Sequence, residues 1–176
     1  EQLIKFLSKR IELKVFTYPN SDPGCDIIIS SFKKFSEKDN NCVLVKNFDD
    51  DTFYPILKNC KFLIGNSSVG IVEAASFNLP VINIGDRQKG KIIPSNVSNS
   101  KFNYKSLNKA YKNISSNSFL SKINKLKNPY GDGESGIKIA RQLLNLKVNK
   151  RLINKKFIEK LSLKINYLSQ LSQNLV

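Results

Sequence analysis

The chain has 176 residues, of which 40% are apolar, and its 29 Lys and Arg against 14 Asp and Glu give a formal net charge of +15. This length and composition are sufficient for one globular domain with an appendage. The sequence contains neither an apolar run of about eighteen residues nor a signal-peptide pattern, so we expect a cytoplasmic protein that does not enter a membrane.

The basic residues are mostly lysines scattered among asparagines and serines. A positive surface can bind nucleic acid through its phosphates. However, the sequence contains no RNA-binding aromatic signature, no zinc-finger spacing and no helix-turn-helix pattern. We therefore favour solvated lysine surfaces over a nucleic-acid interface.

The three cysteines, Cys25, Cys42 and Cys60, show no CxxC spacing, and the chain contains no histidine. Histidine is the commonest metal ligand, and isolated cysteines usually pack as small apolar side chains. We therefore expect buried free thiols, no metal site and no cofactor.

Strand and helix patterns alternate along the first half of the chain. Strands are predicted at residues 12–18, 42–45, 62–64 and 81–84, and helices at residues 25–38, 52–59 and from Ser68 onward. Continuous apolar strands between helices indicate a parallel sheet that is buried on both faces. The predicted fold class is therefore α/β, with a doubly wound parallel sheet.

The second half of the chain is less regular. Residues 91–127 are polar with one or two short helices, and an amphipathic helix is predicted at residues 134–146. We place the domain at residues 1–146 and a basic tail at residues 147–176. An apolar stripe in the tail consists of Phe157, Leu161, Ile165 and Leu168. This stripe can pack on the domain, which we favour, on a missing domain or a second subunit, or on a membrane surface.

The turn at residues 65–68 follows a predicted strand and contains Ser67 and Ser68. In doubly wound sheets, ligands bind beyond the carboxyl ends of the strands, where amides and hydroxyls can hold phosphate, although serines are also ordinary helix caps. Gly70, inside the following helix, suggests that something needs the space of its side chain. Glu73, one turn deeper on the same face, lies too deep for a capping role but can accept hydrogen bonds from both hydroxyls of a ribose. A solvent-facing glutamate is the alternative.

Three segments, GNSSVGIVEA, SFNLPVINIGDRQKGK and NPYGDGES, resemble in order and spacing the C-terminal half of the hydrolysing UDP-N-acetylglucosamine 2-epimerases. The resemblance extends from about Glu12 to Leu146 and includes the loop PNSDPG and the segment VKNF. It implies a Rossmann-like, UDP-binding C-terminal domain of the glycosyltransferase-B arrangement, which faces an N-terminal domain across a cleft.

The resemblance also implies a role for several residues. It places Ser67 and Ser68 at the diphosphate, Glu73 at the ribose, Phe48 at the uracil through its backbone, and Arg87 and Asn20 near the phosphates and sugar. Gly70 is a further candidate, from the argument on its missing side chain alone. The family's acid and base carboxylates lie in the N-terminal domain, and an important histidine lies near the start of the C-terminal one. Since this chain has no histidine, its catalytic residues stay unknown, and Asp22, Asp86 and Asp132 are better explained as turn formers.

We expect the complete protein to convert UDP-N-acetylglucosamine into UDP and N-acetylmannosamine for sialic-acid or related synthesis, without a metal. The reaction would proceed by anti elimination of UDP followed by hydration, and the chain alone would be inactive. Two other interpretations stay open. One is the nucleotide-sugar half of a glycosyltransferase of the same architecture, and the other is a basic binding module without enzymatic activity. The segment INIGDRQKG favours the epimerase, because it belongs to the resemblance and not to the fold in general.

Overall fold

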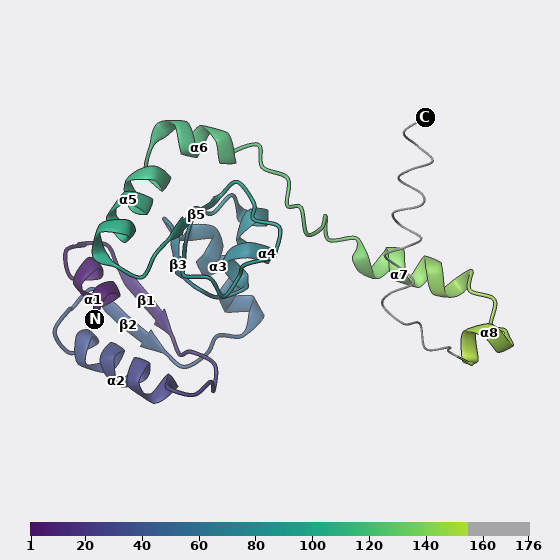
Figure 1. Cartoon of the computed structure of the whole chain (residues 1–176), viewed down its shortest axis with the longest axis horizontal. Helices are drawn as coiled ribbons and strands as arrows, with labels where there is room; N and C mark the ends of the chain where they lie inside the picture. The colour runs from purple at the N-terminus through teal and green to yellow at the C-terminus, as the bar shows by residue number, and fades with distance from the viewer. Residues whose placement is uncertain (155–176) are drawn as a thin grey trace. The chain divides into compact units, whose positions relative to one another are not determined.

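The computed structural model describes residues 1–154, except for the side chain of Arg151 (Figure 1). The chain divides into two compact units, one from Glu1 to Asp132 and one from Gly133 onward. The predicted tail stripe, from Phe157 to Leu168, lies outside the described residues. No helix among residues 1–154 has the length and apolar character that crossing a membrane requires.

The first unit is built around short parallel strands. Within the described residues they are β1 (Lys14–Thr17), β2 (Cys42–Val45), β3 (Leu63–Gly65), β4 (Val81–Ile84) and β5 (Val97–Ser100). β1 pairs with β2 in one sheet, and β3, β4 and β5 form a second sheet in that order, with every pairing parallel. This arrangement confirms the predicted α/β class.

Helices connect and cover the strands (Figure 1). They are α1 (Gln2–Leu7), α2 (Cys25–Ser36), α3 (Asp50–Asn59), α4 (Val69–Val72), the 3-10 helix η1 (Ala74–Phe77), α5 (Tyr104–Ile114), α6 (Asn117–Ile123), α7 (Ser135–Leu144) and α8 (Lys150–Ile153). The polar region at residues 91–127 contains the two expected helices, α5 and α6. It also contains β5, which the sequence analysis did not predict.

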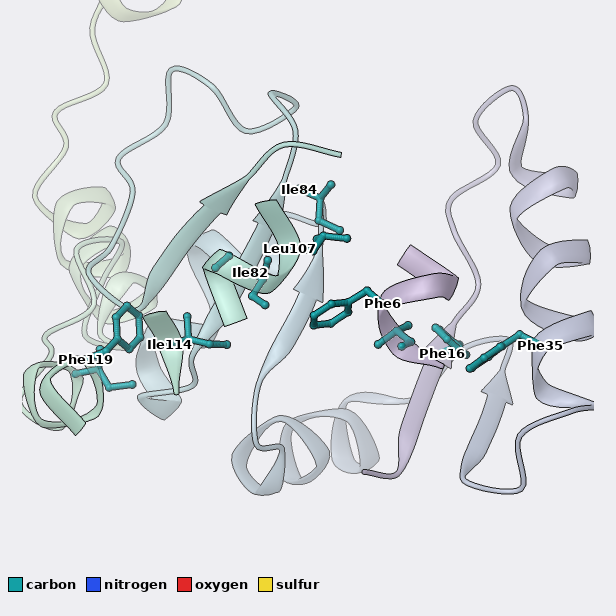
Figure 2. Packing of buried hydrophobic residues seen from close by; sticks show 11 residues of the cluster. Phe6, Phe16, Phe35, Ile82, Ile84, Leu107, Ile114 and Phe119 are labelled. Carbon is teal, nitrogen blue, oxygen red and sulfur yellow. The ribbon is translucent and has the colours of Figure 1, made fainter. Parts of the chain in front are cut away.

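An aromatic and aliphatic cluster joins the two sheets into one core. It includes Phe16 of β1 and Ile82 and Ile84 of β4. Figure 2 shows Phe6 of α1 between the side chains of the first sheet and those of the second, and Phe6 is completely buried. Since burial of one such side chain contributes about 1.5–3 kcal/mol, α1 stabilises the contact between the sheets as well as itself.

Burial differs between the two sheets. β4 is buried on both faces, because Ile82 faces this cluster while Val81 packs with Leu57 and Leu79 on the other side. The prediction of a sheet buried on both faces is therefore correct at β4. It is wrong at β1 and β2, where the paired residues Val15 and Val43 are 39% and 45% exposed.

The second unit contains α7, which confirms the amphipathic helix predicted at residues 134–146. Its apolar residues Ile137, Ile139, Leu143 and Leu144 are all exposed. The first unit ends at Asp132, ahead of this helix. The domain bounds of 1–146 stay a prediction.

Candidate functional site

Loops that follow β1, β3 and β4 meet beyond the carboxyl ends of these strands. Gln88, after β4, donates a hydrogen bond from Nε2 to the carbonyl of Asn66, after β3, at 2.7 Å. Arg87 Nη2 lies 3.8 Å from Asp22 Oδ2 in the loop after β1. The chain turns sharply out of β4 because Gly85 adopts φ +73°, a conformation that other residues rarely take. These contacts define the candidate site as the meeting point of three loops.

Ser67 and Ser68 are exposed in the loop between β3 and α4. Ser68 precedes α4 but makes no side-chain cap hydrogen bond, and the Ser67 hydroxyl lies 3.4 Å from the Val69 amide, which is a long contact. The capping explanation of the two serines is therefore weak. Because α4 has only 4 residues, its dipole is small, and an anion here would depend on the hydroxyls and individual amides.

Gly70 is buried against the second sheet. A Cβ atom added at this position would lie 2.9 Å from Val81 Cγ1 and 3.5 Å from Leu63 Cδ2. The glycine therefore allows α4 to approach β3 and β4 closely. Val81 already occupies this space, so packing explains the missing side chain and no ligand is needed to explain it.

Glu73 lies at a break between two helices and not within one continuous helix, as the sequence suggested. α4 ends at Val72, Glu73 adopts φ −105° and ψ −41°, and η1 begins at Ala74. Its side chain is half-buried, and no ion pair involves it in the described part of the chain. The carboxylate thus has no role in stabilising the fold that the structure reveals.

Asn128 reaches this break from the segment NPYGDGES. Its Nδ2 donates hydrogen bonds to the Val72 carbonyl and to the Ser76 hydroxyl, both at 2.8 Å. Asn128 thus connects a residue before Glu73 with a residue after it, although it lies far from both in the sequence.

Phe48 lies in the loop between β2 and α3, and its half-buried ring stacks on Phe53 with 6.4 Å between centroids. The aromatic series continues through Tyr54 to Phe77 of η1, where the Tyr54–Phe77 centroids are 5.9 Å apart. The Phe48 ring is therefore used in packing, which leaves its backbone for a ligand. Asn20 is exposed in the loop after β1.

A family model of UDP-N-acetylglucosamine 2-epimerases matches residues 1–144 of the chain. The chain belongs to this family. It is 34% identical over 122 residues to the GDP/UDP-N,N'-diacetylbacillosamine 2-epimerase (hydrolyzing) of Campylobacter jejuni, a match that covers 66% of the chain and 31% of that relative. The chain spans about a third of the length of the curated relatives it matches.

Solved structures of UDP-N-acetylglucosamine 2-epimerases share the fold of this chain. The UDP-GlcNAc 2-epimerase from Neisseria meningitidis, bound to UDP-GlcNAc, matches with a TM-score of 0.61 at 17% identity, over 82% of the chain and 40% of that protein. The S. aureus MnaA-UDP co-structure matches with a TM-score of 0.58 at 21% identity, over 89% of the chain and 42% of that protein. The domain is therefore Rossmann-like and of the glycosyltransferase-B type.

Two polar residues of the chain were missed by the sequence analysis. Gln88 is 4% exposed, and its Oε1 is a buried atom without a hydrogen-bond partner within the described residues. Asn128 holds the helix break at Glu73. Both lie in segments that carry the family resemblance, but neither charge nor periodicity distinguishes them from the many other amides of the chain.

Proposed function

We propose that this chain is the UDP-binding half of a hydrolysing UDP-N-acetylglucosamine 2-epimerase. The observation that carries the proposal is the turn with Ser67 and Ser68. Its serines are exposed beyond β3, next to the loops after β1 and β4, and Glu73 follows directly after the short helix α4. Membership of the UDP-N-acetylglucosamine 2-epimerase family supports this reaction and this nucleotide sugar. Two proteins of the same fold are described as bound to UDP-GlcNAc or UDP.

In this proposal the Ser67 and Ser68 hydroxyls donate hydrogen bonds to the diphosphate, with Arg87 beside them. The ion pair of Arg87 with Asp22 does not oppose this role, because it is long and its side chains are 49% and 72% exposed. Exposed pairs of this kind contribute little free energy, so a phosphate can replace the carboxylate. Asn20 lies in the same loop as Asp22, which favours its predicted place near the phosphates and sugar.

The nucleoside would extend from the phosphates toward Glu73 and Phe48. The Glu73 carboxylate has no ion-pair partner among residues 1–154, and such a group can accept hydrogen bonds from both vicinal hydroxyls of a ribose. Phe48 would contact the uracil through its backbone, since its ring packs on Phe53. Gly70 has no place among these contacts, because its missing side chain is explained by Val81.

The proposed reaction begins with removal of the C2 proton of the sugar. The bond between C1 and the phosphate oxygen then breaks with its electron pair on UDP, which gives a 2-acetamidoglucal, and water adds to release N-acetylmannosamine. The base and acid would come from the N-terminal domain. This half would stabilise the negative charge that develops on UDP, through the serine hydroxyls and Arg87. The relatives differ in the sugar that their names give, so UDP-N,N'-diacetylbacillosamine is to be assayed beside UDP-N-acetylglucosamine.

Calorimetry with the purified chain tests the binding part of the proposal. We expect weak binding of UDP, weaker binding of UMP and still weaker binding of uridine. Glu73→Ala should lower the UDP affinity roughly ten- to hundredfold, because loss of a hydrogen bond to a charged group costs about 1.5–3 kcal/mol. Equal affinities for the three ligands would contradict the phosphate role, and an unchanged affinity in Glu73→Ala would contradict the ribose role.

Activity assays test the rest. The chain alone should not release N-acetylmannosamine from UDP-N-acetylglucosamine, because proton abstraction needs a positioned base and the expected one lies outside these residues. Addition of an N-terminal half from the same gene should restore release. Turnover by the chain alone would show that it contains a catalytic set that neither its sequence nor its fold revealed.

A further inference from the structure

The helix break at Glu73 leaves one backbone carbonyl without its usual partner. In a continuous α-helix the Val72 carbonyl would accept a hydrogen bond from the Ser76 amide. Here the Ser76 amide donates to the Glu73 carbonyl at 2.9 Å, because the chain tightens into η1. A buried or half-buried carbonyl without a donor destabilises the conformation that creates it. The break therefore requires a donor from another part of the chain.

Asn128 provides this donor. Its Nδ2 lies 2.8 Å from the Val72 carbonyl oxygen and 2.8 Å from Ser76 Oγ, while its Oδ1 accepts from the Tyr130 amide at 2.9 Å. The Val72 carbonyl can only accept and the Tyr130 amide can only donate, so the orientation of the side-chain amide has no alternative. All of its hydrogen-bonding groups are used, which makes the position specific for asparagine.

The segment that carries Asn128 is itself anchored. The Tyr130 hydroxyl donates a hydrogen bond to the Ile92 carbonyl at 2.9 Å, in the connection between β4 and β5. Asn128 is consequently held from both directions. It binds the residues that precede and follow the helix break, and Tyr130, two residues later, is tied to the connection between β4 and β5.

We propose that Asn128 is a positioning residue that fixes Glu73 for its contact with the ribose, an inference that rests on the proposed function. Its two donor bonds end on Val72 and Ser76, which lie on either side of Glu73. They hold the backbone torsions that set the direction of the glutamate side chain. Asn128 itself does not touch the ligand.

The test compares two ligands that differ only in the hydroxyls that Glu73 would bind. UDP and 2′,3′-dideoxyuridine 5′-diphosphate are titrated into the unaltered chain and into the variants Asn128→Ala and Asn128→Asp. We expect Asn128→Ala to weaken UDP binding about three- to tenfold, which corresponds to loss of neutral hydrogen bonds, and to leave binding of the dideoxy ligand unchanged. Asn128→Asp keeps the acceptor for Tyr130 but directs an oxygen at the Val72 carbonyl, so its loss should be at least as large.

A double-mutant cycle separates positioning from general stability. In the Glu73→Ala background, Asn128→Ala should cause no further loss of UDP affinity, because the group that it positions is absent. Asn103→Ala is the matched control. It removes the side-chain oxygen that accepts a hydrogen bond from the Ser106 amide at the start of α5, far from Glu73 in the sequence. It should lower the melting temperature without a change in UDP affinity.

The outcomes distinguish this inference from the proposed function. Equal losses for UDP and the dideoxy ligand, or additive losses in the double variant, would overturn the positioning role. Binding of UDP that depends on Glu73 but not on Asn128 would overturn it as well, and would leave the proposed function intact. If the unaltered chain does not bind UDP, the proposed function fails, and the inference fails with it.

Discussion

Replacement of Gly70 by alanine tests whether this glycine serves packing or a ligand. Two effects of the change oppose each other. Alanine has a helix propensity about 1 kcal/mol better than glycine, although α4 is so short that only part of this gain applies. The new Cβ atom would stand 2.9 Å from Val81 Cγ1, a separation at which one of the two must move. Overpacking of a core typically costs about 1–3 kcal/mol.

The overpacking effect should win, because Val81 cannot easily move. It is 2% exposed, lies in β4 and packs against Leu57 and Leu79. We expect Gly70→Ala to destabilise the chain by about 1–2 kcal/mol, which corresponds to a melting temperature lower by roughly 2–8 °C at this size. Circular dichroism during heating measures the shift.

Two further variants complete this experiment. Gly136→Ala, in α7, adds a Cβ atom with no described atom within 4 Å, so it should not lower the melting temperature and should raise it slightly through the better helix propensity of alanine. Val81→Ala should remove most of the additional effect of Gly70→Ala when the two are combined. If Gly70→Ala melts at the same temperature as the unaltered chain and loses UDP affinity instead, the glycine serves a ligand and our packing explanation is refuted.

Two other predictions follow from single contacts. Gln88→Glu removes the donor to the Asn66 carbonyl and adds a negative charge beside the proposed diphosphate site. The affinity for UDP should therefore fall at least about tenfold, while the affinity for uridine changes little. Equal losses for both ligands would contradict this. The second prediction concerns Glu12, whose Oε1 lies 2.8 Å from Lys61 Nζ. The hydrogen bond from this ammonium is the main reason that the pKa of Glu12 falls from its usual 4.5 to about 2. Because the folded-state pKa is the lower one, this stabilisation is complete above about pH 4.5 and is lost as the pH falls toward 2. In Glu12→Gln the free energy of unfolding should fall less steeply as the pH decreases through this range. The difference should be no more than about 1 kcal/mol, since Lys61 is exposed. A pH profile identical to that of the unaltered chain would show that the pair contributes nothing to stability.

Apolar patterns were sufficient to predict most of the first unit. β1, β2 and β4 coincide with apolar runs, and α2 and α3 with amphipathic ones, so their positions could be inferred from local sequence. β5 could not, because its sequence VSNS is polar. It is held by pairing with β4, and this pairing includes a hydrogen bond between the side chains of Asn83 and Asn99 at 2.8 Å. Such a strand depends on a partner that only the folded chain provides.

The candidate site was predicted only in part, for the same reason. The exposed serines after β3 follow from turn chemistry, and the structure confirms their location, while their role stays a prediction. The helix break at Glu73 was missed, because Ala74 and Ala75 are good helix formers and local propensity predicts that the helix continues. The break is held by Asn128, more than fifty residues away. Gly70 was recognised as unusual, but its neighbour Val81 is visible only in three dimensions.

The open face of the first sheet has a consequence for how this chain behaves in solution. Ile11, Leu13 and Val15 stand at alternate positions of the sequence, Val43 lies opposite Val15 in the sheet, and all four side chains are exposed. Such a row of apolar side chains favours self-association. The net charge of +15 opposes it, since identical molecules repel each other at low ionic strength. Salt shortens the range of this repulsion to about 8–10 Å near physiological concentration and leaves the apolar attraction intact. We therefore expect the colloidal stability of the isolated chain to decrease as salt is added, which is the reverse of the behaviour of proteins that associate through opposite charges.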